Sequence, residues 1–505
     1  MADSTAAEHV DVLVVGAGLS GVGAGCHLTM SCPGKTFAIL ESRQDIGGTW
    51  DLFRYPGIRS DSDMYTLGYA FRPWKEAKAI ADGPSILRYI RDTAREFGVD
   101  EKIRFGHKVV AAQWSTADAQ WTVEVVRSDG QRLQMTCGFL LTCTGYYRYD
   151  EGYTPDFAGT DDFRGQIVHP QHWPDDLDYA GKRVVVIGSG ATAVTLVPAM
   201  AESAAHVTML QRSPTYVVSL PAKDPLAGLL RKFLSAKAAY PIIRWKNVLL
   251  TMLSFQLSRR RPHVMKGIIR KGLQKQLPAG YDIDTHFTPR YNPWDQRLCL
   301  VPDGDLFRVL SDGTASIVTD TIDTFTERGI RLASGEELEA DIIVTATGLN
   351  MLALGGLTFT VDGRPVKLSE TIGYKGMMFS GVPNLASAVG YTNASWTLKC
   401  DLTCEYVCRL LNYMDDEGYR QVVPKAPDPS VPTRPFIDLT SGYVQRSVDQ
   451  FPRQGQKAPW RLYQNYVRDI LLLRHGKLVD DALEFSRGGS ASAPPSTEPE
   501  ERLTA

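Results

Sequence analysis

Two short glycine-rich loops contain the residues whose types and spacing could do chemistry. The first reads Gly16-Ala17-Gly18-Leu19-Ser20-Gly21, and the second reads Gly188-Ser189-Gly190-Ala191-Thr192-Ala193-Val194. Glycines at such positions let the backbone approach a pyrophosphate closely at the positive end of a helix. The pattern is informative only where a strand precedes the loop and a helix follows it.

The elements expected around both loops meet that condition. Residues 9–15 and 183–187 are short β-branched runs stopped by glycine, which is typical of buried parallel strands. An apolar helical pattern follows each loop, and further strands are expected at residues 37–40 and 206–210. The same strand–loop–helix–strand unit therefore occurs twice, which predicts an α/β fold with two dinucleotide-binding, Rossmann-like domains.

The residues that follow the second strand of each unit have opposite charge. Glu41 follows residues 37–40, and its carboxylate would accept hydrogen bonds from a ribose 2′-hydroxyl and repel a 2′-phosphate. Arg212 and Ser213 follow the other strand, and a guanidinium matches a 2′-phosphate with two parallel hydrogen bonds. The favoured interpretation is one chain that binds FAD and NADP. The alternative is that the second loop is only a tight turn and Arg212 a solvated charge.

Two further segments combine turn-forming and aromatic residues. The first is Gly47-Gly48-Thr49-Trp50 followed by Tyr55-Pro56-Gly57-Ile58-Arg59-Ser60-Asp61, and the second runs from Phe163 through Gly165 and His169 to Trp173-Pro174. At every fixed position they resemble the two fingerprints of the type I Baeyer–Villiger monooxygenases, and Trp173 stands where related flavin-containing monooxygenases usually have Tyr or Phe. Within that family, the amino-acid sequences of these segments resemble most closely those of the ethionamide-activating monooxygenases of mycobacteria.

The resemblance implies how the domains are arranged along the chain. Residues 341–348 resemble the segment that returns the chain to the FAD domain, and a helical stretch is expected as an insertion in the NADP domain. The expected parts are the FAD-binding domain (1–148 and 351–487), the NADP-binding domain (149–220 and 293–350), the helical insertion (221–292) and a disordered tail (488–505).

The resemblance also assigns roles to residues. It makes Arg297 the catalytic arginine and Asp61 an acid near the flavin that could pair with it, whereas the residues alone allow Asp61 to be a turn cap. His169 is implied to be a linker residue that supports NADP binding and domain rotation. Gln296 stands where many members have a lysine, so the preference for NADPH rests mainly on Arg212. The residues implied to lie at the FAD are Gly48, Thr49, Trp50, Arg59, Ser60, Asp61 and Val109.

The reaction implied by the resemblance is the insertion of one oxygen atom of O2 into a ketone, giving an ester or lactone. NADPH would reduce the FAD, and a C4a-peroxyflavin would attack the carbonyl. Because negative charge develops on the peroxide and then on the alkoxide, the permanent charge of Arg297 suits the site. The same oxidant would oxygenate sulfides or thioamides. Two alternatives are an N- or S-oxygenating flavin monooxygenase and a non-catalytic flavin redox sensor.

Composition excludes several other classes of protein. Of the 505 residues, 43% are hydrophobic and 22% are charged, which is ordinary for a folded soluble protein. The 55 basic residues nearly balance the 57 acidic residues, so a nucleic-acid partner is not expected. The cysteines lack a CxxC pair, and together with the absence of a secretory signal this favours a cytoplasmic setting.

Two clusters of residues are open to more than one interpretation. Cys400, Cys404 and Cys408 share one helical face, where core packing is favoured over a metal site, and no metal is expected. Residues 223–275 are basic and helical, and their most apolar part is too short to cross a bilayer. This stretch could be a solvated face, a wall near the NADP phosphates, or a weak peripheral contact with a membrane surface.

Overall fold

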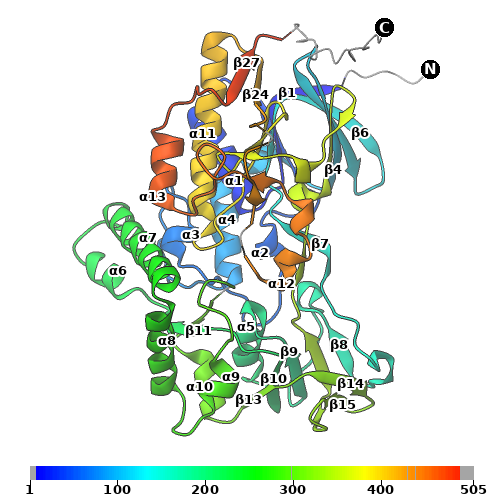
Figure 1. The fold of residues 1–505 in the computed structure, drawn as a ribbon, viewed down its shortest axis with the longest axis vertical. Helices are drawn as coiled ribbons and strands as arrows, with labels where there is room; N and C mark the ends of the chain where they lie inside the picture. The colour runs from blue at the N-terminus through cyan, green and yellow to red at the C-terminus, as the bar shows by residue number, and fades with distance from the viewer. Residues whose placement is uncertain (1–6, 297, 429, 438, 489–505) are drawn as a thin grey trace, which may run out of the picture.

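The computed structural model describes residues 7–296, 298–428, 430–437 and 439–488. Two separate sheets, one above the other in Figure 1, form the centres of two halves of the molecule. The first sheet has the order β20 (Arg364–Pro365), β19 (Thr358–Val361), β4 (His107–Ser115), β5 (Gln120–Arg127), β6 (Arg132–Thr142), β1 (Glu8–Val15), β2 (Phe37–Leu40), β3 (Ile103–Arg104), with β23 (Leu385–Ser387) also paired to β6.

The second sheet is smaller and entirely parallel. Its order is β13 (Ala315–Thr319), β10 (His206–Gln211), β9 (Arg183–Ile187), β17 (Ile342–Thr345), β8 (Gln166–Val168). In each sheet the strand before a glycine loop lies between two parallel partners, β1 between β2 and β6 and β9 between β10 and β17. This is the repeated unit predicted from the sequence, and the four expected strands are present within one residue at each end.

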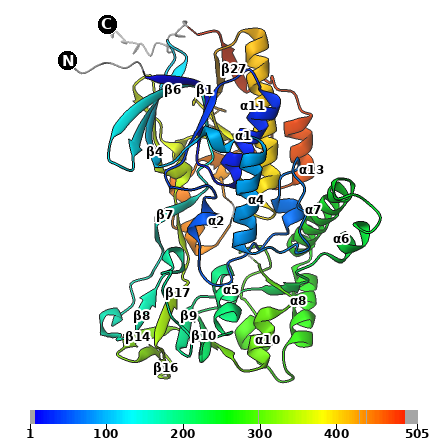
Figure 2. The same cartoon turned by 180° about the vertical axis from the view of Figure 1, so that it is seen from behind.

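Helices cover both sheets and project from one side of the molecule (Figures 1 and 2). The apolar pattern after the first loop predicts a helix to Leu28, and the helix continues to Ser31. The helices are α1 (Leu19–Ser31), α2 (Thr49–Leu52), α3 (Met64–Leu67), α4 (Gly83–Glu96), α5 (Ala191–Met200), α6 (Pro225–Leu230), α7 (Ala236–Arg260), α8 (Pro262–Gln276), α9 (Ile283–Phe287), α10 (Asp305–Ser311), α11 (Trp396–Glu417), α12 (Gly442–Gln445) and α13 (Tyr466–Asp469).

Short strands complete the fold and join the two halves. β7 (Tyr147–Gly152) leaves the first sheet after β6, and β18 (Leu349–Met351) leaves the second after β17; the two pair with each other. The remaining pairs are β11 (Val217–Leu220) with β12 (Cys299–Pro302), β14 (Ile322–Thr326) with β15 (Gly329–Leu332) and β16 (Glu337–Glu339), β21 (Gly373–Tyr374) with β22 (Met378–Phe379), β24 (Gln421–Pro424) with β27 (Leu483–Ser486), and β25 (Arg434–Pro435) with β26 (Arg453–Gln454).

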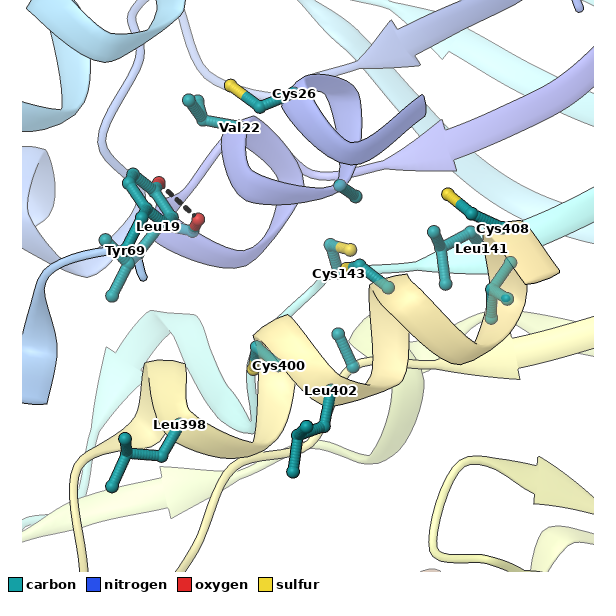
Figure 3. Close-up of a cluster of buried hydrophobic side chains, with 14 of the residues drawn as sticks. Leu19, Val22, Cys26, Tyr69, Leu141, Cys143, Leu398, Cys400, Leu402 and Cys408 are labelled. Atoms are coloured by element: carbon teal, nitrogen blue, oxygen red, sulfur yellow. Dashed lines mark hydrogen bonds between the residues drawn. The ribbon is translucent and has the colours of Figure 1, made fainter. Parts of the chain in front are cut away.

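The stripe of cysteines belongs to the core of the first half. Cys400, Cys404 and Cys408 are buried on α11, which packs against α1 and the end of β6. Figure 3 shows Cys400 and Cys408 in this core. The thiol of Cys400 lies 3.3 Å from the hydroxyl of Ser20 on α1. In the described part of the chain, His, Cys, Asp and Glu form no group that could hold a metal ion. Packing therefore accounts for this stripe.

The helical insertion divides between the two halves. Tyr240, Ile243 and Val248 of α7 belong to the core that surrounds the first sheet. Met265 and Ile269 of α8 belong to the core of the second sheet. The strands that enter and leave the insertion, β11 and β12, pair in parallel with each other. The insertion thus starts and ends beside the second sheet but spans both halves.

Candidate active site

The first glycine loop is held tightly between strand β1 and helix α1. Gly16 has φ of +100°, and a Cβ there would lie 2.7 Å from the carbonyl oxygen of Cys143. A Cβ on Gly21 would lie only 1.8 Å from the carbonyl oxygen of Gly16. Gly18 caps α1 without a side-chain hydrogen bond, so the N–H groups of its first turn remain for a ligand. These features fit a bound pyrophosphate.

The Gly47-Gly48-Thr49-Trp50 segment lies directly against this loop. Gly47 bridges Gly18 in a parallel manner, and a Cβ on Gly48 would lie 3.0 Å from the Cα of Gly18. The hydroxyl of Thr49 lies 3.1 Å from that of Tyr149, and burial raises the pKa of Tyr149 to about 12. Trp50 is half-buried against the core of the first half. The structure therefore joins two motifs that are separated in the sequence.

Glu41 is positioned for a ribose by the backbone around it. Its side chain is buried, and its two oxygens accept the N–H groups of Ala17 at 2.7 Å and Arg43 at 2.8 Å. The oxygen that accepts from Arg43 also accepts the hydroxyl of Ser42 at 3.3 Å, and the oxygen that accepts from Ala17 keeps a lone pair for a ribose hydroxyl. The carbonyl of Glu41 accepts the N–H of His107, which brings the start of β4 and the buried Val109 to the same edge.

The second glycine loop has an open helix end. A Cβ on Gly188 would lie 2.3 Å from the carbonyl oxygen of Ala346, whereas a Cβ on Gly190 would meet nothing within 4 Å. Ser189 donates a hydrogen bond of 3.1 Å to the carbonyl of Ser213. This bond ties the loop to the segment that carries Arg212 and Ser213, both exposed after β10. Ala191, Thr192, Ala193 and Val194 form the first turn of α5. A dinucleotide phosphate fits this end.

The segment from Tyr55 to Arg59 crosses from the first half to the second. A Cβ on Gly57, whose φ is +73°, would lie 2.7 Å from the Cβ of Ala199 on α5. Arg59 forms an ion pair with Asp305 at the start of α10, with one Nη2–Oδ1 distance of 3.3 Å. The expected FAD neighbour Arg59 therefore also connects the two halves.

Asp61 follows this crossing and influences its neighbours. Burial raises the pKa of Tyr55 to about 12; a hydrogen bond with Thr192 opposes this rise, and the charge of Asp61 adds to it. The buried Ser60 accepts the N–H of Ser62 at 2.9 Å, and Asp63 caps α3 by accepting the N–H groups of Tyr65 and Thr66. Ser60 and Asp63 therefore form a turn and a helix cap on either side of Asp61, whose exposed side chain lies close enough to Tyr55 to affect the pKa of that tyrosine.

Arg297, the predicted catalytic residue, lies outside the described residues. The turn before it is fixed from two sides. The carboxylate of Asp295 accepts the N–H of Asn292 at 3.1 Å and pairs with Arg259 at 2.5 Å. The carbonyl of Asp295 accepts the hydroxyl of Thr440 at 2.8 Å. After position 297 the chain enters β12.

A mostly apolar pocket lies between the first loop and this turn. Tyr146 and Trp396 stack at 4.9 Å, and Trp396 donates to the hydroxyl of Ser20 at 2.9 Å. At its other side the pocket includes Leu439, the neighbour of Thr440. The lining residues are Tyr146, Met351, Gly376, Val389, Gly390, Tyr391, Thr392, Trp396, Lys399, Phe436, Ile437, Leu439, Tyr443, Val444, Leu462 and Gln464.

The pocket contains a buried ion pair, Lys399 with Asp469, that the sequence did not indicate. Lys399 is 2% exposed, and its ammonium lies 3.0 Å from the carboxylate of Asp469. Tyr391 donates to the same carboxylate at 2.6 Å, and burial raises the pKa of that tyrosine. A lysine within an apolar helix pattern usually indicates a solvated surface, so the sequence carried no signal for it.

His169 lies where the two linkers meet. Its Nε2 lies 3.2 Å from the carbonyl oxygen of Gly348, and its Nδ1 accepts the N–H of Gln171 at 3.2 Å. A Cβ on Gly152 would lie 1.9 Å from its ring, so only glycine fits beneath it. Burial lowers the pKa of His169. With both ring nitrogens engaged, this placement agrees with a linker residue and gives no proton-transfer role.

Comparison with known proteins places the chain among flavin enzymes. Residues 71–270 match the family model described as flavin-binding monooxygenase-like, and residues 14–81 match that of an NAD(P)-binding Rossmann-like domain. The FAD-containing monooxygenase EthA of Mycobacterium tuberculosis (strain ATCC 25618 / H37Rv) is 59% identical over 481 residues, covering 95% of this chain and 98% of EthA. EthA of Mycolicibacterium smegmatis is 55% identical over 485 residues, covering 96% and 98%.

Solved structures share the fold. A steroid monooxygenase bound to NADP superposes with a TM-score of 0.75 at 23% identity, covering 95% of this chain and 100% of the other. An open structure of cyclohexanone monooxygenase superposes with a TM-score of 0.74 at 18% identity, with the same coverage. The expected fold with FAD and NADP domains and the expected relationship to flavin monooxygenases are confirmed. The chain belongs to the family of FAD-containing monooxygenases that includes EthA.

Proposed function

We propose that the protein is an NADPH-dependent Baeyer–Villiger monooxygenase that converts ketones to esters or lactones and also oxygenates sulfides or thioamides. The observation that carries the proposal is the crossing of Tyr55–Arg59 from the first glycine loop to α5 of the second. This crossing supports FAD and NADP sites on one connected surface, and Asp61 follows the crossing closely enough to influence Tyr55. Direct hydride transfer between two bound cofactors requires such an arrangement.

Residues of both loops would hold the cofactors. The pyrophosphate of FAD would lie on the N-terminus of α1 with its ribose on Glu41, and the 2′-phosphate of NADPH would lie on Arg212 and Ser213. When bound, FAD supplies the activation of O2 and NADPH supplies the electrons. The assigned FAD residues are Gly16, Gly18, Ser20, Gly21, Glu41, Gly48, Thr49, Trp50, Arg59, Ser60, Asp61 and Val109. The assigned NADP residues are Gly188, Ser189, Gly190, Ala191, Thr192, Ala193, Val194, Arg212 and Ser213.

The protein's own contribution is charge and exclusion of water. We assign to Arg297 the stabilisation of the alkoxide that forms when the ketone carbonyl is attacked, because a guanidinium remains charged at any working pH. Asp61 is assigned the orientation of that guanidinium. The aromatic lining around Tyr146 and Trp396 would exclude water and select apolar ketones. The ammonium of Lys399 is neutralised by Asp469 and therefore does not compete for the developing charge.

The test compares Arg297→Ala with a matched control at Arg290, an exposed arginine in the same connecting segment. Linear, aromatic and cyclic ketones are incubated with NADPH and air, and the ester, lactone and hydrogen peroxide are quantified. Arg297→Ala should keep FAD and NADPH-dependent flavin reduction but lose at least about 100-fold in ester formation. Arg290→Ala should match the wild type.

Other outcomes would redirect the assignment. Ester formation retained in Arg297→Ala would reject the role of Arg297. A wild-type protein that oxygenates sulfides but no ketone would favour the N- or S-oxygenating alternative, because that class needs only a soft nucleophile. A bound flavin that NADPH does not reduce would favour the redox-sensor alternative. Comparison of the rates with NADPH and NADH measures the dependence attributed to Arg212.

A further inference from the structure

The outer side of helix α7 is apolar and exposed. Ile242 is 49% exposed, Leu249 54% and Leu253 66%, and they follow one another at spacings that place them on one side of a helix. Trp245 and Leu250 flank this row and are 42% and 56% exposed. We call these five residues the α7 apolar face. Folded proteins seldom leave a contiguous apolar row of this size in water unless it contacts something.

The opposite side of the same helix anchors it firmly. Ile243 and Val248 are buried in the core of the first half. The guanidinium of Arg244 is buried and donates at 2.7 Å to the carbonyl oxygens of both Tyr65 and Gly68. Helices α6 and α7 project from the body of the molecule in both views (Figures 1 and 2). The α7 apolar face is therefore rigidly presented on a protruding element.

The chain around this face is basic and has no acidic residue between Pro225 and Tyr281. Arg260 continues the row of Ile242, Leu249 and Leu253 at helical spacing, and Arg261 follows it. Both arginines are exposed. Phe233, 79% exposed, and the exposed Lys232 lie at the other end, before α7 begins. Lys246 and Arg259 of α7 pair with Asp224 and Asp295. Apolar residues and exposed cations nevertheless occur together along one element.

This combination fits an interfacial helix. No helix in the described ranges is both long enough and apolar enough to cross a membrane. A second copy of the chain is a poor partner, because a symmetric contact would bring two basic surfaces together. An anionic lipid surface offers opposite charge to the arginines and a hydrocarbon boundary to the leucines. We propose that the α7 apolar face docks the protein on an anionic lipid bilayer.

Docking on this face would give apolar substrates a route from the bilayer to the pocket. This route, unlike the docking itself, rests on the proposed function. Thr251, Met252 and Phe255 on the inner side of α7 line a cavity that also includes Tyr391 and Gln464. Tyr391 and Gln464 line the aromatic pocket as well. An apolar substrate dissolved in the bilayer would therefore reach the pocket past α7.

The test uses the full-length FAD-bound protein and vesicles of phosphatidylcholine, with or without phosphatidylglycerol. Co-sedimentation should show binding to the anionic vesicles that weakens as salt is added. The double variant Leu249→Ser/Leu253→Ser should lower the partition constant by about tenfold or more. Arg260→Gln/Arg261→Gln should lower it by a similar factor at low salt and by less at high salt.

Matched controls separate docking from general effects. Met30→Ser/Val479→Ser replaces two side chains of comparable exposure elsewhere, 44% and 45%, and should bind like the wild type. Bound flavin and the unfolding temperature show that each variant is folded. Absence of vesicle binding by the wild type, or equal binding by all variants, would refute the proposal. Self-association in sedimentation velocity that Leu249→Ser/Leu253→Ser abolishes, without vesicle binding, would assign the face to a second copy.

Discussion

Replacing Gly21 by alanine should weaken FAD binding selectively. The new Cβ would lie 1.8 Å from the carbonyl oxygen of Gly16, whereas ordinary contact begins near 3.4 Å. Because the obstructing atom belongs to the backbone, it cannot rotate aside, and α1 must move away from β1. Overpacking of this kind costs about 1–3 kcal/mol. If the movement falls on the pyrophosphate site, FAD affinity should drop roughly 5- to 150-fold.

The second loop provides the control. It carries Ala193, fully buried, at the position equivalent to Gly21, so the second unit already accommodates a methyl group between helix and strand. Gly190→Ala meets no atom within 4 Å and has an ordinary φ of −82°, so the fold should tolerate it. Its methyl group would instead occupy the space where the NADP pyrophosphate is expected. Gly190→Ala should therefore raise the KM for NADPH and leave FAD affinity unchanged.

Flavin absorbance of the purified variants and fluorescence titration of the apoproteins measure FAD affinity, and steady-state NADPH oxidation measures the KM for NADPH. Wild-type FAD affinity and unfolding temperature in Gly21→Ala would refute the steric argument. Loss of FAD from Gly190→Ala would show that the second loop does not bind NADP independently of the first.

Three further changes test other parts of the site. Arg212→Gln should raise the KM for NADPH about tenfold or more and leave the KM for NADH within about twofold, since one charge-assisted contact to the 2′-phosphate is lost; equal effects on both would reject this role. Lys399→Met should destabilise the protein by about 3–5 kcal/mol in chemical unfolding, because Asp469 is left buried without its cation, and Lys399→Met/Asp469→Leu should recover most of that loss. Burial lowers the folded pKa of His169, so the unfolded chain binds its proton first as pH falls. Stability from this group is complete above the unfolded value of 6.5 and should decline as pH falls through it, and His169→Gln should remove that part of the pH dependence in thermal unfolding.

The sequence could predict the parts of the fold that depend on short segments. A buried strand, a glycine loop and a helix occupy consecutive residues, so β1 with α1 and β9 with α5 could be found from local periodicity. The cysteine stripe of α11 could be assigned to the core for the same reason. The opposite endings at Glu41 and Arg212 were equally local, and the structure places each beside its loop.

Contacts between distant segments left no such local pattern. The pairing of Arg59 with Asp305 joins residues that are 246 positions apart in the sequence, and neither residue differs by itself from a surface charge. The pocket combines Tyr146 with Trp396 and Leu439, whose proximity depends on the packing of both halves. The basic stretch at residues 223–275 likewise does not show in its local sequence which of its cations are buried. Arg244 lies within the basic stretch 223–275, yet it is buried against carbonyl oxygens of the first half.

The division of the insertion also determines where the two halves can move. Arg244 holds α7 to the first half, while Ile269 holds α8 to the second. A rotation of the second half relative to the first must therefore be absorbed where the insertion changes halves, between β11 and α6 and again between α7 and α8. At the second place Arg261 has φ and ψ of −136° and 61°, which are non-helical. The paired linkers β7 and β18, on which His169 packs, and the Tyr55–Arg59 crossing also connect the halves. Since α7 stays with the first half, a protein docked through its apolar face would keep the first glycine loop fixed relative to the bilayer while the second loop moves.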